Sequence, residues 1–220
     1  MTDQMPFPWP TTVKPITELS ESVLRISTSM VLPKAIVLEK FLSDDECEGL
    51  IQLALPCFQR SEVISTTTGN EEVYGSRTSE GMFLAKRQTP LVEKIEKRIC
   101  EAFNWQEERT EALQMLRYTP GAHYEAHHDY FNESYPGSAS AIKRGGQRVG
   151  TLLMYLATPE EGGETFFPES GLAVQALKGN ALLFVYEYPD DRSKSLHAGS
   201  PVTKGVKFVA TKWFRQSVFV

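Results

Sequence analysis

The second half of this 220-residue chain consists of short runs of alternating apolar and polar residues, separated by residues that favour turns. Successive residues of a β-strand point to opposite faces of its sheet, so this alternation predicts strands rather than helices. So many short strands with frequent turns favour a double-sheet jelly roll, also called a double-stranded β-helix. The expected strands cover residues 111–118, 123–131, 147–156, 164–167, 172–175, 180–187, 194–198 and 206–217.

Two helices are expected ahead of these strands. Ser43 and Glu46 have the spacing of a capping box, which predicts a helix that ends at about Leu55. A second helix is expected to begin near Thr89, with Pro90 at its first position. Further strands are expected at residues 34–38 and 61–65. The fold class is therefore α+β and mainly β: a jelly-roll core buttressed by N-terminal helices.

The length of the chain fits one domain. Residues 1–32 are weakly patterned and are expected to form an N-terminal arm, followed by a single domain at residues 33–220. Residues 66–76 and 132–146 are rich in small and polar residues and predict long loops. Long loops in a compact domain usually have a function, so both are candidate lids over a binding site.

All four histidines lie in two short patches. In a strand, His127 and Asp129 point to the same side and His128 points away. His123 lies four residues before His127 on the same side of such a strand, and the second patch, with His197, is expected to supply the further ligand. Two imidazoles and one carboxylate form the facial triad that holds non-heme Fe(II) and leaves positions open for oxygen chemistry. A zinc site more often contains thiolate or a third imidazole.

Lys207 follows His197 after a short interval, in a segment that alternates like a strand. A 2-oxo acid that chelates iron carries a distal carboxylate, and the compact ammonium of a buried lysine suits that group. Each feature alone has an ordinary explanation, since lone lysines are usually solvated and a His-x-Asp sequence arises by chance. Their combination predicts an Fe(II) centre that uses a 2-oxo acid.

Motifs around these residues carry a family resemblance. They lie at residues 77–81, 118–131, 148–156, 161–168 and 196–213. With them the chain resembles the prolyl 4-hydroxylases, in particular the short, single-domain bacterial and algal Fe(II)/2-oxoglutarate dioxygenases, over about residues 33–217. Ser200 and Phe208 depart from the family pattern, which often has Cys and Trp there. Neither is a predicted ligand, so these departures concern the substrate more than the catalysis.

The resemblance implies a jelly-roll core at about residues 111–217 and a role for particular side chains. The iron would be held by His127, Asp129 and His197. The far carboxylate of 2-oxoglutarate would be bound by Lys207, helped by the hydroxyls of Tyr118 and Thr151. The target proline ring would lie against Tyr124 and Trp213. Taken alone, Tyr118, Thr151 and Trp213 are equally compatible with a structural role.

The activity implied by the resemblance is hydroxylation of prolyl residues to 4-hydroxyproline in a peptide or protein. Oxygen and 2-oxoglutarate would be consumed, succinate and CO2 released, and ascorbate would serve as reductant. A proline-rich segment in polyproline II form suits a groove lined by aromatic residues. The alternatives are a dioxygenase that hydroxylates a free amino acid or small metabolite, a nucleic-acid dealkylase, and a non-catalytic binding module.

Composition limits the partners and the compartment. The formal net charge is -5 and basic residues are dispersed, so no nucleic-acid partner is expected. No apolar run is long enough to span a membrane, and the first residues do not resemble a secretory signal. Cys47, Cys57 and Cys100 are odd in number and lack metal-site spacing, which favours reduced thiols and a cytoplasmic enzyme. A homodimer is a possible assembly.

Overall fold

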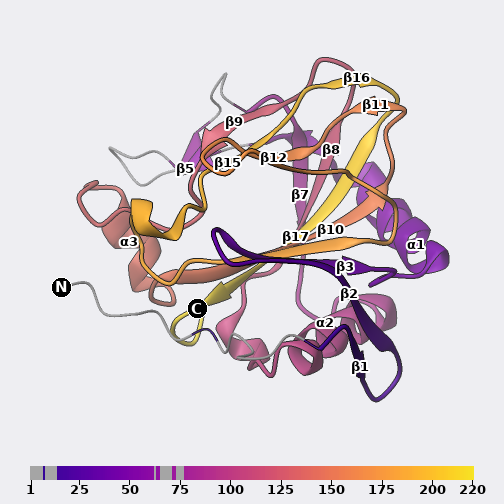
Figure 1. Ribbon diagram of the computed structural model, residues 1–220, viewed down its shortest axis with the longest axis horizontal. Helices are drawn as coiled ribbons and strands as arrows, with labels where there is room; N and C mark the ends of the chain where they lie inside the picture. Colours follow the sequence, from indigo (N-terminus) through magenta and orange to yellow (C-terminus); the bar gives the residue numbers. More distant parts are fainter. Residues whose placement is uncertain (1–6, 8–13, 62, 65–70, 73–76) are drawn as a thin grey trace.

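Two antiparallel sheets face each other in the computed structural model, which describes residues 7, 14–61, 63–64, 71–72 and 77–220 (Figure 1). The large sheet has the order β1 (Ile16–Glu18), β2 (Val23–Met30), β3 (Lys34–Glu39), β14 (Ala181–Val185), β10 (Arg148–Ala157), β17 (Lys207–Arg215), β8 (Leu113–Tyr118), β7 (Glu80–Leu84), β4 (Gln59–Arg60). The small sheet has the order β13 (Leu172–Val174), β12 (Thr165–Phe167), β15 (His197–Gly199), β9 (Tyr124–His127). Two short ribbons pair β11 (Glu161–Gly162) with β16 (Val202–Lys204) and β5 (Val63–Ile64) with β6 (Glu71–Glu72). The predicted mainly β, double-sheet fold is confirmed.

Both predicted helices are present, as α1 (Asp44–Ala54) and α2 (Pro90–Ala102). The capping box of α1 is complete, because Ser43 Oγ accepts from the Glu46 amide at 3.2 Å and Glu46 Oε2 accepts from the Ser43 amide at 3.0 Å. The remaining helical turns are η1 (Leu55–Cys57), η2 (Glu107–Arg109), α3 (Ser138–Lys143) and η3 (Asp191–Ser193). Among the described residues, every helix falls short of the length and hydropathy needed to cross a membrane.

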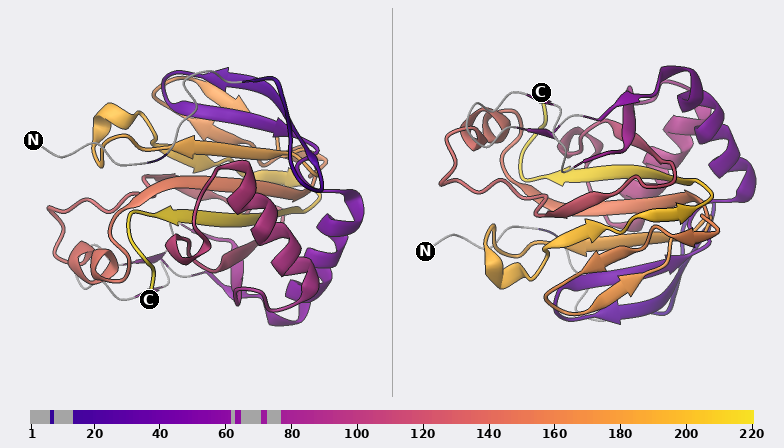
Figure 2. Two further views of the ribbon diagram at one scale, coloured as in Figure 1. Left: turned by 90° about the horizontal axis from the view of Figure 1, so that it is seen from below. Right: turned by 90° about the horizontal axis from the view of Figure 1, so that it is seen from above.

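Strand β17 separates helix α2 from the interior of the jelly roll. Its residues 207, 209, 211, 213 and 215 line a cavity between the sheets. The alternate residues face the helices: Lys212 pairs with Glu96 of α2 at 2.5 Å, and the Phe214 ring lies 5.8 Å from that of Phe103. This is the alternation expected of a strand buried on both faces. Helix α1 lies at one end of the molecule and α3 at the other (Figures 1 and 2).

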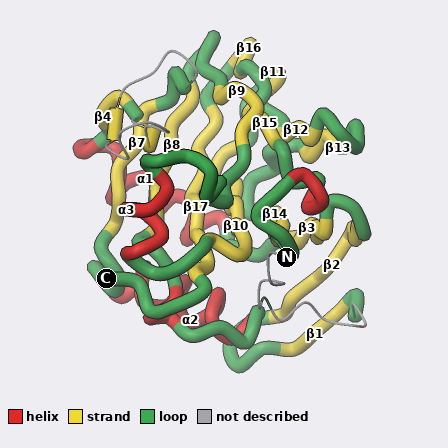
Figure 3. Tube along the Cα trace, turned by 90° about the vertical axis from the view of Figure 1, so that its left-hand side faces the viewer, coloured by secondary structure: helices red, strands yellow, loops and turns green. Residues whose placement is uncertain are grey.

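Viewed from the α3 end, β8, β17 and β10 lie side by side in the large sheet, with β9, β15 and β12 in the small sheet (Figure 3). Strand β9 ends at His127 rather than at residue 131 as predicted, because the chain bends at Asp129 and Tyr130. Likewise β15 begins at His197 rather than at residue 194, because η3 precedes it. The early end of β9 and the late start of β15 place the two histidines at the rim of the small sheet.

Several elements were not predicted. Strands β1 and β2 lie within the predicted N-terminal arm and extend the large sheet beside β3. Most residues of β2 are exposed, so its sequence lacks apolar alternation. The predicted loop 132–146 contains α3, and most of the predicted loop 66–76 lies outside the described residues. The domain boundary at residue 33 stays a prediction.

Candidate functional site

The predicted metal ligands lie together at one rim of the small sheet. His127 and His197 are register partners on the adjacent strands β9 and β15. Asp129 Oδ1 lies 3.5 Å from His127 Nε2, and Asp129 Oδ2 lies 3.7 Å from His197 Nε2. Each residue offers one ligand atom, and these atoms all lie within 4.8 Å of one another. A cluster of two imidazoles and one carboxylate at these distances fits a single metal ion.

Backbone carbonyls fix the orientation of both imidazoles. His127 Nδ1 lies 2.8 Å from the carbonyl oxygen of Glu125, and His197 Nδ1 lies 3.0 Å from that of Ser195. A carbonyl can only accept, so each Nδ1 carries the proton and each Nε2 keeps a lone pair directed at the cluster. Burial and the neighbouring His127 lower the pKa of His197 to about 4, which keeps its imidazole neutral. The His197 ring is therefore in the form that coordinates a metal.

Three residues hold Asp129 from the side of the large sheet. Thr151 Oγ1 donates to Asp129 Oδ2 at 2.6 Å, and the Tyr186 hydroxyl hydrogen-bonds to Thr151 and lies 3.5 Å from the same carboxylate oxygen. Arg148 Nη1 donates to the Asp129 backbone oxygen at 3.4 Å. Thr151 thus contacts the carboxylate and does not line the cavity. Its predicted contact with 2-oxoglutarate stays a prediction.

A cavity of about 1440 Å³ extends between the sheets from the triad to Lys207. Lys207 is only 3% exposed, and its Nζ lies 5.2 Å from the centre of the Tyr118 ring on the paired strand β8. Burial lowers the pKa of Lys207 to about 8, with Glu164 acting in the opposite direction. No carboxylate of the described residues pairs with this ammonium within 4 Å. A buried cation without a counter-ion is a suitable site for an anionic ligand.

The two predicted aromatic residues also line the cavity. Tyr124 stacks on the His127 ring with 3.6 Å between ring centres, and the Arg77 guanidinium lies 4.7 Å from the centre of the Tyr124 ring. Trp213 carries the Arg148 guanidinium 3.8 Å from its ring centre, and its buried Nε1 has no hydrogen-bond partner among the described residues. Both residues thus border the cavity, with a charged or imidazole side chain packed against each ring.

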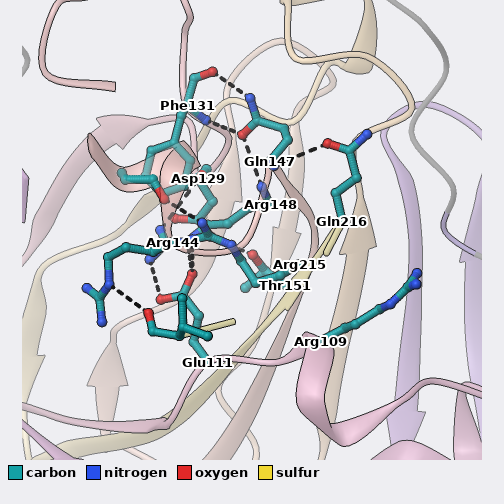
Figure 4. A network of polar contacts seen from close by, with 12 residues as sticks. Arg109, Glu111, Asp129, Phe131, Arg144, Gln147, Arg148, Thr151, Arg215 and Gln216 are labelled. Atoms are coloured by element: carbon teal, nitrogen blue, oxygen red, sulfur yellow. Dashed lines mark hydrogen bonds and ion pairs between the residues drawn. The ribbon is translucent and has the colours of Figure 1, made fainter. Parts of the chain in front are cut away.

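A charged network that the sequence did not indicate lies beside the triad (Figure 4). Glu111 accepts from Arg148 at 2.7 and 3.0 Å and from Arg215 at 2.8 Å. Burial alone would raise the pKa of Glu111, but Arg148 and then Arg215 hold it below the usual range. Arg215 shares the parity of Lys207 on β17, and this alternation was the one sequence signal that could have placed it at the cavity.

Known proteins match both the sequence and the fold. The sequence profile of the 2OG-Fe(II) oxygenase superfamily matches residues 113–215. Prolyl 4-hydroxylase 1 of Arabidopsis thaliana is 42% identical over 201 residues, which cover 84% of this chain and 69% of that protein.

Solved structures agree. The 2OG complex of the viral collagen prolyl hydroxylase of Paramecium bursaria Chlorella virus-1 matches with a TM-score of 0.62 and 30% identity, over 82% of this chain and 95% of that one. A prolyl hydroxylase of Trichoplax adhaerens shares the fold, with a TM-score of 0.57 and 17% identity over 83% of each chain.

Proposed function

The chain belongs to the prolyl 4-hydroxylase family of 2-oxoglutarate/Fe(II) oxygenases, and from this we propose that its substrate is a prolyl residue within an extended peptide segment. The enzyme is a 2-oxoglutarate-dependent dioxygenase of the proline 4-hydroxylase type. The main observation in favour of a peptide substrate is the size of the cavity. At about 1440 Å³ it exceeds the ~300–1,000 Å³ of ordinary small-molecule pockets, so free proline and 2-oxoglutarate would leave much of it unfilled.

His127, Asp129 and His197 would hold Fe(II), in agreement with the Nδ1 contacts to backbone carbonyls that turn both Nε2 atoms toward Asp129. Together with 2-oxoglutarate, the bound iron supplies the oxygen activation that the side chains themselves cannot perform. The overall reaction consumes one 2-oxoglutarate, one oxygen molecule and one prolyl residue, and yields succinate, CO2 and a hydroxyprolyl residue. The protein therefore contributes chiefly binding and orientation.

Lys207 would pair with the far carboxylate of 2-oxoglutarate. Its ammonium lies deep in the cavity on β17, beside the Tyr118 ring, with no carboxylate partner of its own among the described residues. Burial strengthens an ion pair formed there, because little water competes with it. Tyr118 is itself buried and would add a hydroxyl to the same end of the cavity.

Tyr124 and Trp213 would hold the target proline ring beside the iron. Tyr124 lies directly on the His127 imidazole, so a ring in contact with Tyr124 is within reach of the metal centre. In the same fold, the Trichoplax adhaerens enzyme has been solved in complex with a peptide fragment of hypoxia inducible factor.

The test supplies Fe(II), ascorbate and 2-oxoglutarate to the enzyme, with a proline-rich peptide or free proline as substrate. We expect succinate formation with the peptide and, by mass spectrometry, the gain of one oxygen atom on a proline. Asp129→Ala should abolish both signals. Oxidation of free proline with no change in the peptide would overturn the peptide proposal and favour a small-metabolite hydroxylase.

We further propose that ascorbate is the reductant and that the enzyme is a cytoplasmic homodimer. In support of a reducing compartment, Cys47, Cys57 and Cys100 are all free. Burial raises the pKa of both Cys47 and Cys100 to about 11, so these thiols resist oxidation. Turnover without ascorbate, cell fractionation and light scattering of the purified protein test the three points separately.

A further inference from the structure

Gln147 binds both backbone groups of Phe131. Gln147 Oε1 accepts from the Phe131 amide at 2.7 Å, and Gln147 Nε2 donates to the Phe131 carbonyl oxygen at 2.7 Å (Figure 4). The Gln147 side chain is buried, with the whole residue only 4% exposed. Its amide thus replaces the pair of hydrogen bonds that a neighbouring strand would form with Phe131.

These bonds join the two ends of the segment 132–146. Phe131 precedes this segment and Gln147 follows it, immediately before β10. The segment contains α3 and supplies Tyr135 and Arg144, among others, to the cavity wall. Gln147 therefore closes the base of a loop that forms part of the substrate cavity.

Asp129 depends on this closure, because β9 ends at His127 and no strand pairing reaches the carboxylate. Its side chain is held by Thr151, whereas the only hydrogen bond that its backbone receives from the described residues is the 3.4 Å bond from Arg148. Phe131, two residues further along, is the next point at which the chain is firmly attached. Gln147 Oε1 also accepts from the Arg148 amide at 3.0 Å, which ties the same amide to the start of β10.

We propose that Gln147 is a positioning residue for the metal ligand Asp129, acting through the backbone of Phe131. The inference rests on the iron site of the proposed function and assigns to Gln147 the task of holding the third ligand in place when no strand does so. Residues that support metal ligands from behind typically contribute ~10–100-fold to metal affinity. For a residue that acts through one intervening backbone unit, we expect an effect of about tenfold.

The experiment measures Co(II) binding to the metal-free full-length protein by calorimetry and by the visible absorption of bound Co(II). Gln147→Glu keeps the shape but sets a carboxylate oxygen against the Phe131 carbonyl, and Gln147→Met removes both bonds. Gln216→Leu is the matched control, because Gln216 Oε1 accepts from the Gln147 backbone amide at 3.3 Å, whereas the side-chain hydrogen bonds to the Phe131 backbone described above come from Gln147. We expect both Gln147 variants to bind Co(II) about tenfold more weakly with an altered absorption spectrum, and Gln216→Leu to bind as the unaltered protein does.

A merely structural role would lower the melting temperature and leave the Co(II) affinity and spectrum of the folded protein unchanged, and that result would overturn the proposal.

Hydrogen exchange on the unaltered protein adds a measurement that needs no variant. Co(II) should slow exchange of the Phe131 amide, and unchanged exchange there would also count against Gln147. Wild-type Co(II) binding without peptide hydroxylation would refute the proposed function while leaving the effect of Gln147 measurable.

Discussion

Thr151 Oγ1 donates a 2.6 Å hydrogen bond to Oδ2 of Asp129 and so connects the large sheet to the carboxylate of the triad. Thr151 lies in the middle of β10, opposite Trp213 on β17. Asp129 follows β9 of the small sheet. A hydrogen bond to an ionised carboxylate is stronger than one between neutral groups, and here it holds the carboxylate with Oδ1 facing His127 and Oδ2 facing His197. Thr151 therefore orients a metal ligand, and this role is separate from its predicted contact with 2-oxoglutarate.

Thr151→Val separates these two roles. The substitution keeps the shape and removes the hydroxyl, so we expect the affinity for Co(II) in the absence of 2-oxoglutarate to fall by ~10-fold. A contact with 2-oxoglutarate alone would instead raise the KM for that compound and leave the Co(II) affinity unchanged. Thr110→Val is the control, because Thr110 is buried and bonds to the Glu107 carbonyl oxygen at 2.7 Å, outside the triad.

Lys207→Met should affect ligand binding and stability in opposite directions. The affinity for 2-oxoglutarate should fall steeply, by ~3–5 kcal/mol, because its far carboxylate would be buried without a partner. Without ligand, the melting temperature of the variant should equal or exceed that of the unaltered protein, since the variant removes a buried ammonium that has no carboxylate partner among the described residues. Lys204→Met on the surface of β16 is the control. An unchanged KM for 2-oxoglutarate would show that another residue binds the carboxylate.

The binding of 2-oxoglutarate should depend on pH through Lys207, whose pKa burial lowers from 10.5 to about 8. Above pH 8 the free enzyme must take up a proton to form the ion pair, so the dissociation constant should rise by about tenfold per pH unit. In the unfolded chain this lysine keeps its proton up to pH 10.5. Between pH 8 and 10.5 the folded protein therefore holds fewer protons than the unfolded chain. As pH rises through that range, the titration of Lys207 increases the free energy of unfolding and so stabilises the folded state.

Lys207→Arg is the matched variant for this pH dependence, because a guanidinium stays charged throughout the range. Calorimetric titration of 2-oxoglutarate against pH should give a flat profile for Lys207→Arg and a rising dissociation constant for the unaltered enzyme. The same rise in both proteins would assign the titration to a group other than Lys207.

Strand parity predicted that His127 and Asp129 point to the same side, and their side chains do so although the strand itself is shorter than expected. His127 and Asp129 do turn toward the same point, with Asp129 beyond the end of β9. Parity also places Lys207 and Trp213 on the same side of β17. A period of two is a local property, so it survives an error in the length of the strand.

The supports of the site could not be predicted in this way. Tyr186 reaches Thr151 from β14's end, and Gln147 reaches Phe131 across the base of a loop. Both contacts depend on which strands become neighbours in the sheets, and a single sequence carries no signal for that order. The exposed strand β2 was missed for a different reason, since strands without a buried face lack the alternation that identifies them.

Glu96 and Lys212 form a fully buried ion pair at 2.5 Å on the helix-facing side of β17. Glu96→Gln would leave the ammonium without its counter-ion, so we expect a loss of ~3–5 kcal/mol in the free energy of unfolding, measured by urea denaturation. Replacement of both partners by Glu96→Leu and Lys212→Met should restore most of this stability, because the double variant leaves no buried charge. Since Lys212 points away from the cavity, the double variant should bind Co(II) and 2-oxoglutarate normally. Weakened binding in this stable variant would mean that the helix face of β17 controls the site on its other face.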